Sequence, residues 1–295
     1  MITVRQLIAG DVEAAARLLF ESFSAVYLQR GHTPPFPNVD SAAWLCRAYL
    51  DLDPGGCALA EVGGQSLGVG FAHPRGAVAS IGPIAARHSG PPGIGRAIMD
   101  HFHRLTRGCQ SVRLFQDSFN PDSFGFYTRL GYSVVDVAPY LLAEQLAPPA
   151  TRPRLVRIAT SSDLRQIEQY DLSRTGADRS RDLALLAQSG SAFVMEQGTI
   201  GGTITGYLFY RSLPARVIIG PAVAESAEIL SALIDAVAAA LPGRAAVIRG
   251  SAAVPSVLQI AFDRGFRVDH LGNLMVAGDY RSPPAQLYAL FPESL

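Results

Sequence analysis

The stretch Gly90-Pro91-Pro92-Gly93-Ile94-Gly95-Arg96 decides the fold, because it joins an extended segment, Ile81-Gly82-Pro83-Ile84-Ala85, to an apolar run that starts at Ala97. A strand, a glycine turn and a helix start in this order make an anion site. Backbone N–H groups at a helix N-terminus point at a phosphate, and the helix dipole favours negative charge there. Glycine suits the turn because a Cβ would hold the phosphate away from the backbone. A plain loop before a helix is the alternative.

Composition narrows the class of protein. A chain of 295 residues is long enough for two domains. Its 25 Lys+Arg and 25 Asp+Glu balance, so no overall field favours binding to nucleic acid or to a membrane. Every basic side chain is Arg or His, because the sequence contains no lysine. Schiff-base chemistry and a lysine-bearing P-loop are therefore excluded.

The cysteines and the apolar runs indicate the compartment. Three cysteines, without metal-ligand spacing, argue against a disulfide scaffold and fit a reducing cytoplasm. No signal-peptide pattern and no uncharged apolar run of about 18 residues is present. We expect a cytoplasmic protein without a metal.

The chain repeats one plan on either side of a Pro-rich linker at 147–154. We therefore expect two domains, 1–146 and 155–295. The pairs that repeat are Val4-Arg5 before Asp11 with Val156-Arg157 before Asp163, Ile81-Gly82-Pro83 with Ile219-Gly220-Pro221, and Leu130-Gly131-Tyr132 with Arg264-Gly265-Phe266.

Periodicity and turn residues predict a mixed α/β sheet in each copy. In the first copy we expect strands near 2–7, 57–62, 66–73, 77–85, 111–116 and 132–142, and helices near 11–23, 40–51, 94–107 and 121–130. In the second copy we expect strands near 155–159, 191–196, 203–210 and 215–222, and helices near 163–171, 180–188, 226–241 and 255–263.

This order of elements resembles the GNAT superfamily of acyl-CoA-dependent N-acyltransferases. The resemblance covers nearly the whole first copy and implies two GNAT-like domains in tandem, each a mostly antiparallel twisted sheet flanked by helices. It implies that the CoA pyrophosphate binds the backbone of Gly93, Ile94 and Gly95, next to Arg96. Gly90 stands where the family usually has Gln or Arg. The co-substrate implied is acetyl-CoA or another acyl-CoA.

The strand before this loop is the second part of the expected acyl-CoA site. The resemblance implies that Ile81, Gly82, Pro83 and Ile84 splay from the neighbouring strand and offer backbone groups to the pantetheine arm. Pro83 agrees, because proline cannot donate to a strand ladder. An ordinary strand end is the alternative.

Asn120 and Tyr127 flank the next helix start. The resemblance implies that Asn120 lies against CoA and that Tyr127 protonates the departing thiolate, a step that needs a positioned acid. The alternative is that Tyr127 packs in the core with Phe124 and Leu130.

The general base is not identified by the sequence. Glu61, Asp117, His73 and His88 are the candidates, and each has a structural alternative. A water relay or an acceptor that arrives as the free amine would remove the need for one.

The second copy is expected to be degenerate and not to bind CoA. Counting from the repeated Ile-Gly-Pro places Ser231 and Leu233 at the glycine positions, and Val254 and Ala261 stand for Asn120 and Tyr127. Glu225 and Glu228 stand near the helix start, where carboxylates replace phosphate.

The acceptor pocket is expected between the loop Tyr27–Pro35, which includes His32, and the second copy. The run Gly176-Ala177-Asp178-Arg179 resembles a segment of bacterial tandem GNAT proteins, whose degenerate half frames that pocket. Asp178 could bind an ammonium, and Arg179 or Arg181 a carboxylate. Alternatively, Asp178 caps a helix and the arginines are solvated.

The function expected is N-acylation of a small amine or of a metabolite amino group, by direct transfer in a ternary complex. A non-catalytic acyl-CoA-binding or sensing protein is the alternative. A dinucleotide-binding module is disfavoured, because its glycines should follow the first strand. The acceptor, the acyl chain length and the oligomeric state, a homodimer included, stay open.

Overall fold

The computed structural model describes residues 1–149, 155–198 and 202–290. The chain divides into two compact units, Met1–Leu114 and Phe115–Leu295. Most of the linker predicted at 147–154 lies outside the described residues, and Ala147–Pro149 have no regular structure. Among the described residues, no helix combines the length and the apolarity that crossing a bilayer requires.

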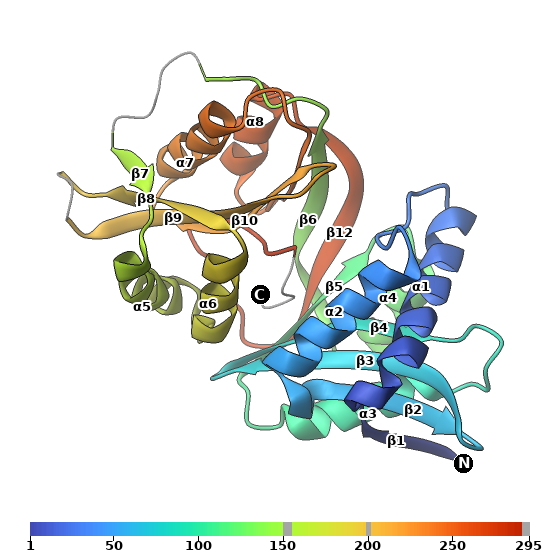
Figure 1. Ribbon diagram of the computed structural model, residues 1–295. Coiled ribbons are helices and arrows are strands. Elements are labelled where there is room, and N and C mark those ends of the chain that lie inside the picture. Colours follow the sequence, from blue (N-terminus) through green and yellow to red (C-terminus); the bar gives the residue numbers. More distant parts are fainter. Residues whose placement is uncertain (150–154, 199–201, 291–295) are drawn as a thin grey trace. The chain divides into compact units, whose positions relative to one another are not determined.

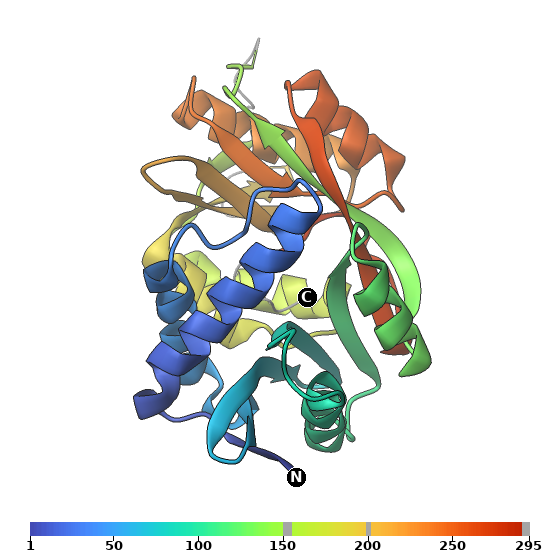
Figure 2. The same cartoon turned by 90° about the vertical axis from the view of Figure 1, so that its right-hand side faces the viewer.

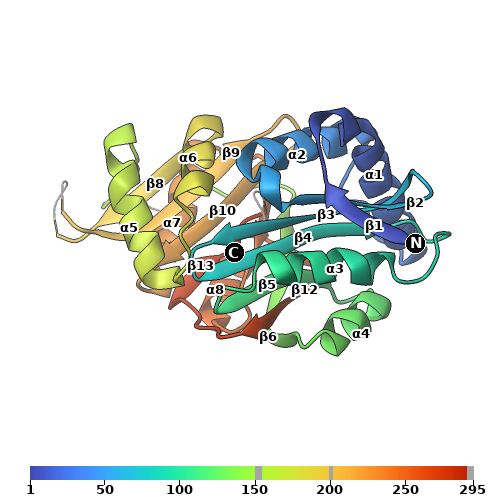
Figure 3. The same cartoon turned by 90° about the horizontal axis from the view of Figure 1, so that it is seen from below.

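The elements of the first unit follow the predicted order. They are β1 (Ile2–Gln6), η1 (Ala9–Asp11), α1 (Val12–Gln29), α2 (Val39–Leu52), η2 (Pro54–Gly56), β2 (Cys57–Val62), β3 (Gln65–Arg75), β4 (Val78–Ala86), α3 (Ile94–Leu105) and the beginning of β5 (Ser111–Asp117). Strands β1 to β4 pair antiparallel in sequence order, and β5 pairs with β4 in parallel. Helices α1 and α2 cover one face of this sheet, and α3 covers the other (Figure 3).

A close approach of α3 to β3 fixes where α3 begins. A Cβ on Gly68 of β3 would lie only 2.5 Å from Cγ2 of Ile94 and 2.9 Å from Cδ1 of Ile98. Only glycine leaves room for these buried isoleucines. The first turn of α3 is therefore held against the sheet by apolar packing.

The second unit contains the remaining elements. They are the end of β5, α4 (Pro121–Arg129), β6 (Ser133–Ala143), β7 (Val156–Ile158), η3 (Ser161–Asp163), α5 (Leu164–Thr175), α6 (Ser180–Ser189), β8 (Ser191–Glu196), β9 (Ile204–Ser212), β10 (Val217–Ala224), α7 (Ala227–Ala240), β11 (Ala246–Arg249), α8 (Pro255–Asp263), β12 (Arg267–Gly278) and β13 (Ala285–Leu287). The strand order is β5-β12-β6-β11-β10-β9-β8-β7, and β13 pairs with β10. Helices α7 and α8 lie on one face of strands β8 to β10, and α5 and α6 lie on the other (Figure 1).

The two copies exchange their last long strands. Strand β6 of the first copy pairs antiparallel with β12 and, along its other edge, with β11 of the second copy. Strand β12 in turn lies between β5 and β6 (Figure 2). The sequence repeat thus ends near residue 146, but the compact unit ends at Leu114. The difference from the predicted domains arises because backbone pairing binds β6 to the second copy.

The repeat itself has a structural signature in an ion triad. Arg5 binds both Asp11, at 2.6 Å, and Glu61, at 2.7 Å. In the second copy Arg157 binds Asp163 at 2.8 Å and also pairs with Glu196. Each triad ties the first strand of its copy to the following helix turn and to the neighbouring strand. The spacing of Arg and Asp noticed in the sequence therefore reflects a repeated contact.

Several predicted boundaries were wrong. Helix α1 continues through Tyr27 to Gln29, so the predicted loop Tyr27–Pro35 is helical in its first three residues. The apolar face of α1 extends to the buried Tyr27, and this packing outweighs the nearby turn residues. Strands β11, β12 and β13 were not anticipated, because their partners are distant in sequence.

The strand exchange generates a prediction about the separated copies. Residues 1–146 and 155–295, produced as two chains, should each lack strand partners and should recover native structure only when they are combined. Co-purification of a tagged 1–146 chain with an untagged 155–295 chain measures this. A monomeric 1–146 chain with its own cooperative thermal transition would contradict the exchange.

Candidate active site

Strand β4 leaves its neighbour β5 after a short parallel contact. The pairs are Val78 with Ser111, Ala79 with Val112 and Ser80 with Arg113, and none follows among the described residues. On the other edge, the pairing with β3 shifts between Ile81 and Ile84, so Gly82 and Pro83 form a bulge. The Gly82–Pro83 peptide is cis. The backbone of β4 beyond Ser80 therefore has no ladder pair with β5, in keeping with the splay expected for Ile81 to Ile84.

The N-terminus of α3 has no capping side chain. Its N-cap is Gly93, with φ of 99°, and its first turn contains no acidic residue. Gly93 is exposed, and Gly95 is half-buried. Arg96 is exposed and pairs with Asp100 at 2.8 Å. Helix N-termini leave their first N–H groups without partners inside the helix, so this end of α3 can receive an anion.

Gly90 has a different reason to be glycine. A Cβ on Gly90 would lie 2.8 Å from Cδ1 of Ile94 and 3.1 Å from the carbonyl oxygen of Arg87. The Gly90 amide donates to that same carbonyl at 2.9 Å, which closes the turn before α3. Gly90 thus shapes the loop by local packing.

The second copy fills the space that the first copy leaves beside the bulged strand. Strand β10 also bulges, between Ile219 and Ala222, and pairs with β11 only at Val217 and Ile218. Beyond that point β13 pairs antiparallel with β10. The Tyr288 amide then donates to the carbonyl of Arg249 on β11 at 2.9 Å.

This filling is tight. A Cβ on Gly220 would lie 2.8 Å from the carbonyl oxygen of Tyr288, whereas a Cβ on Gly82 would meet no described atom within 4 Å. Strand β13 thus occupies the space where β10 and β11 diverge.

The N-terminus of α7 is also satisfied by its own side chains. The Ser226 hydroxyl accepts a hydrogen bond from the Ile229 amide at 3.4 Å, and Glu228 stands in the first turn. The hydrogen bond with Ser226 lowers the pKa of Glu228, which favours its anionic form. This helix end already holds a carboxylate where α3 holds none.

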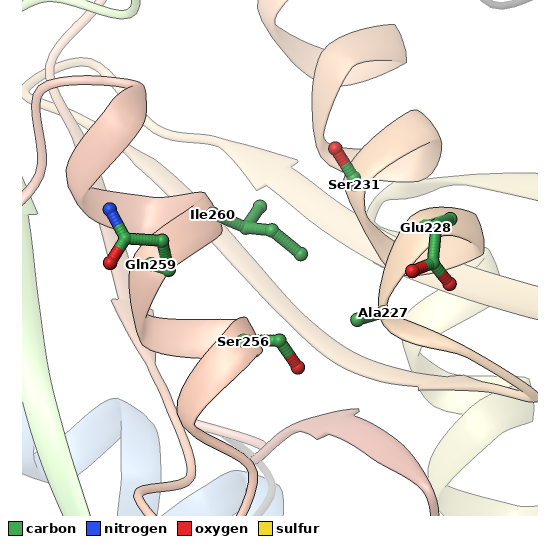
Figure 4. A pocket seen from close by; sticks show the side chains of 6 residues that line it. All are labelled: Ala227, Glu228, Ser231, Ser256, Gln259 and Ile260. Atoms are coloured by element: carbon green, nitrogen blue, oxygen red, sulfur yellow. The ribbon is translucent and has the colours of Figure 1, made fainter.

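A pocket of about 350 Å³ opens between α7 and α8 (Figure 4). Its lining side chains come from the first turns of α7 and the middle of α8: Ala227, Glu228, Ser231, Ser256, Gln259 and Ile260. The Glu228 carboxylate stands among them, so an anionic ligand would be repelled. We assign no phosphate to this pocket.

The structure corrects the predicted equivalence of the glycine positions. Counting from Gly220 placed Ser231 and Leu233 at Gly93 and Gly95, but α7 begins at Ala227, so Ser226 is the counterpart of Gly93. The connection from bulge to helix is shorter in the second copy. By contrast, Asn120 and Val254 are both N-caps followed by Pro, and Tyr127 and Ala261 hold the same helical position.

Asn120 is the N-cap of α4, and Tyr127 lies in the last turn of this helix, in the second unit. The Asn120 side chain caps the helix by accepting from the Ser123 amide at 3.2 Å. The Tyr127 side chain is half-buried, with its ring 5.2 Å from Phe126 and 6.1 Å from Tyr132. Burial, aided by the charge of Asp117, raises the pKa of Tyr127 to about 12, so the phenol stays protonated at neutral pH.

Two base candidates have structural partners. Glu61 belongs to the ion triad with Arg5. The second copy has the same triad although it lacks the glycine loop, which indicates a structural role for the triad. The His73 ring is fully buried and its Nδ1 lies 2.7 Å from Asp53, which also binds Arg75 at 2.6 Å. His88 lies exposed in the turn before α3. None of the three gains support as a base.

The residues predicted to bind the acceptor make contacts within the protein. The buried Arg179 donates to Asp171 at 2.9 Å and to the Tyr207 hydroxyl at 3.0 Å, so its fork is used within the core. Asp178 is exposed and accepts from the Ser180 amide at 3.3 Å at the start of α6. Asp178 thus bonds to the first residue of α6, but Arg179 is the N-cap of this helix and no side chain caps it. The predicted solvation of Arg179 was wrong, because this side chain is buried. Tyr27 packs edge-on against the ring of His32, 6.5 Å between centroids.

One group that the sequence did not reveal stands at the end of β5. Nε2 of His270, on β12, lies 3.6 Å from Oδ1 of Asp117. Asp117 was a candidate base, but strand β12 and its histidine were not anticipated. Among the described residues, no group of three or more His, Cys, Asp or Glu could hold a metal ion.

The comparisons with known proteins concern both copies. Residues 167–289 match the family model described as an acetyltransferase (GNAT) domain. This match covers most of the second copy, whereas the glycine loop and Tyr127 belong to the first. No curated protein sequence matches the chain significantly.

Solved structures are similar over nearly the whole chain. A candidate acetyltransferase from Pyrococcus horikoshii has a TM-score of 0.76 at 17% identity, over 97% of this chain and 92% of its own. A GCN5-related N-acetyltransferase from Sphaerobacter thermophilus has a TM-score of 0.64 at 15% identity, over 95% and 96%. A tandem GNAT protein from the clavulanic acid biosynthesis pathway has a TM-score of 0.61 at 13% identity, over 96% and 100%. At these identities the likeness concerns the fold.

The buried cluster around Asp53 generates a prediction about stability. Burial alone would raise the pKa of Asp53, but hydrogen bonds from His73 and Arg75 outweigh it and lower the pKa from 3.8 to about 2. Asp53→Asn leaves Arg75 buried without its counter-charge and should cost about 3–5 kcal/mol of unfolding free energy at pH 7. The extra unfolding free energy of the unaltered protein, relative to Asp53→Asn, should be lost as the pH falls from about 4 to about 2.

Urea denaturation at pH 7 and at lower pH measures both effects. Glu13→Gln, which removes an exposed pair with Arg17, is the control and should change stability by less than about 1 kcal/mol. Equal losses of unfolding free energy in the two variants would show that the buried cluster stabilises the protein no more than an exposed ion pair does.

Proposed function

Because the chain has the tandem GNAT acetyltransferase fold, we propose that it is an N-acyltransferase that transfers an acyl group, acetyl in the first instance, from CoA to a small amine. The GNAT fold supports acyl-CoA-dependent acetyl transfer in general, and the family implies an acyl-CoA co-substrate. The finer assignment, of the first copy as the acyl-CoA-binding half, rests on the asymmetry between the copies.

That asymmetry is the observation that carries the proposal. In the first copy β4 diverges from β5 with no described strand between them, and α3 starts without a side-chain cap. In the second copy β13 pairs with the bulged strand, and Ser226 and Glu228 occupy the helix end. A pantetheine arm carries amides that can bond to a strand edge, and a pyrophosphate suits an uncapped helix end. Only the first copy offers both.

The reaction proposed is direct attack of the amine on the thioester. The amine nitrogen bonds to the carbonyl carbon, the carbon–sulfur bond breaks, and the sulfur leaves as a thiolate. The Tyr127 phenol supplies the proton that converts the thiolate to CoASH. Burial raises the pKa of this phenol to about 12, so the proton is in place at neutral pH before the thiolate departs.

Titration with acetyl-CoA, together with a thiol-release screen, tests the proposal. The screen uses putrescine, tyramine, glucosamine and lysine amide as acceptors. Binding of acetyl-CoA with CoASH release in the presence of one amine is the expected result. Binding without release from any amine would leave an acyl-CoA-binding or sensing protein, and absence of binding would overturn the proposal.

Gly93→Val tests the assigned anion site. A β-branched residue at a φ of 99° is strained by about 1–2 kcal/mol, and its side chain would hold a phosphate off the amides. Loss of charge-assisted hydrogen bonds worth about 1.5–3 kcal/mol should weaken acetyl-CoA binding roughly 10- to 100-fold by calorimetry.

Gly64→Val is the matched control. Gly64 lies in the turn between β2 and β3 with a φ of 80° and no described atom near its Cβ position. It should lose similar stability but keep acetyl-CoA affinity. Equal affinity in the two variants would discredit the site.

Tyr127→Phe tests the proposed acid. Loss of a general acid typically costs about 10²-fold or more in rate, so kcat should fall by about that factor while the acetyl-CoA Kd stays within about two-fold. Tyr132→Phe, which removes a neighbouring buried phenol, is the control and should keep its kcat. Unchanged turnover in Tyr127→Phe would remove this residue from the mechanism.

A further inference from the structure

The second copy contributes a histidine to the end of a first-copy strand. Through the strand exchange, β12 lies beside β5, and the Ser118 amide after β5 donates to the Leu271 carbonyl of β12 at 2.9 Å. This pairing places His270 next to Asp117. The acid proposed above, Tyr127, lies in the same unit and experiences the charge of Asp117.

The contacts of His270 define its protonation. Nδ1 lies 2.7 Å from a carboxylate oxygen of Asp269. A carboxylate only accepts hydrogen bonds, so in the neutral imidazole the proton sits on Nδ1 and the lone pair sits on Nε2. Nε2 is buried and faces Asp117 across 3.6 Å, longer than a hydrogen bond but within ion-pair range. A second proton therefore enters at Nε2, through Asp117.

Aromatic rings hold the imidazole in place. The Tyr140 ring of β6 stacks on it, with 4.2 Å between centroids, and Phe119 meets it edge-on at 5.6 Å. Arg249 of β11 lies 4.3 Å from the same Tyr140 ring. Among the described contacts, two carboxylates and two rings thus face His270, with one guanidinium behind a ring.

We propose that His270 stores the proton that the acceptor amine loses, taking it through the Asp117 carboxylate and releasing it by the same route to solvent. This inference rests on the proposed function. His270 acts through Asp117 and is a positioning residue for the proton. Asp117, whose side chain is 21% exposed, is the group that meets the amine.

The step balances. The amine loses one proton to Asp117 and His270 as its nitrogen bonds to the acyl carbon. The sulfur gains one proton from Tyr127 as the carbon–sulfur bond breaks. The stored proton then passes from His270 through the partly exposed Asp117 to solvent, and the Tyr127 phenolate regains a proton from solvent. Amine and acyl-CoA become amide and CoASH, and each side chain regains its starting state.

The electrostatics suit this role. Burial alone would lower the pKa of His270, but the nearby carboxylates of Asp117 and Asp269 outweigh it and raise the pKa above its usual value. A raised pKa brings the imidazole closer to an ammonium, so it accepts the proton more readily. The neutral form must predominate before each turnover, so activity should rise with pH through the pKa of His270.

NMR titration of the histidine rings tests the contact without turnover. The sequence has six histidines, so the His270 signals can be assigned by their loss in His270→Gln. In Asp117→Asn the pKa of His270 should fall toward its usual value. An unchanged His270 pKa in Asp117→Asn would overturn the relay.

Kinetics with the amine that gives CoASH release test the role. His270→Gln and Asp117→Asn should each lower kcat/KM by about 10²-fold and abolish the acidic limb of the pH profile, with acetyl-CoA affinity unchanged. His101→Gln, a half-buried histidine of α3, is the control and should retain both. A full-rate His270→Gln enzyme with the original pH profile would overturn this inference and leave the proposed function standing. If no amine releases CoASH with the unaltered protein, the proposed function fails and the inference falls with it.

Discussion

Backbone pairing between β6 and β12 is the constraint on which the rest of the second unit depends. The two strands pair antiparallel from Ser133 to Leu142 against Arg267 to Val276. Each strand belongs by sequence to one copy and by pairing to the other. Because strand hydrogen bonds must be satisfied, neither copy completes its sheet alone. The exchange gives a physical reason for keeping the two copies in one chain.

The copies differ where a ligand would bind, and the differences act together. The first copy combines a diverging bulged strand with a helix that starts at Gly93. The second copy pairs β13 with the corresponding strand and caps the helix with Ser226. The same topology therefore leaves β4 without a described strand beside it beyond Ser80 in one half, and pairs β10 with β13 at the corresponding place in the other. The family model matches residues 167–289, in the second half, while these local features bear on the proposal of which half binds.

Local signals predicted much of the fold and the helix ends of the site. Gly93 and Asn120 begin helices as the glycine turn and the Asn-Pro pair indicated, and Ala261 occupies the position of Tyr127 in the second copy. These features depend on neighbours within a few residues. The strand at 77–85 was predicted as well, and its splay was expected from the resemblance, with which Pro83 agrees because proline cannot donate to a strand ladder.

Features that depend on distant partners were not predictable in this way. The ion pair of Glu61 with Arg5 joins residues far apart in sequence, and so does the bond from Arg179 to Tyr207. Strand β13 is short, and only its pairing with β10 shows that it fills a groove. His270 has no motif around it, so its approach to Asp117 became visible only through the exchanged strand.

A crystal structure of the protein grown with acetyl-CoA tests the central claim most directly. The account predicts one acetyl-CoA per chain, with its pyrophosphate on the amides of Gly93 to Arg96, its pantetheine along β4 beyond Ser80, and no density beside α7. A pyrophosphate at the start of α7, or a ligand-free α3 at saturating acetyl-CoA, would contradict it.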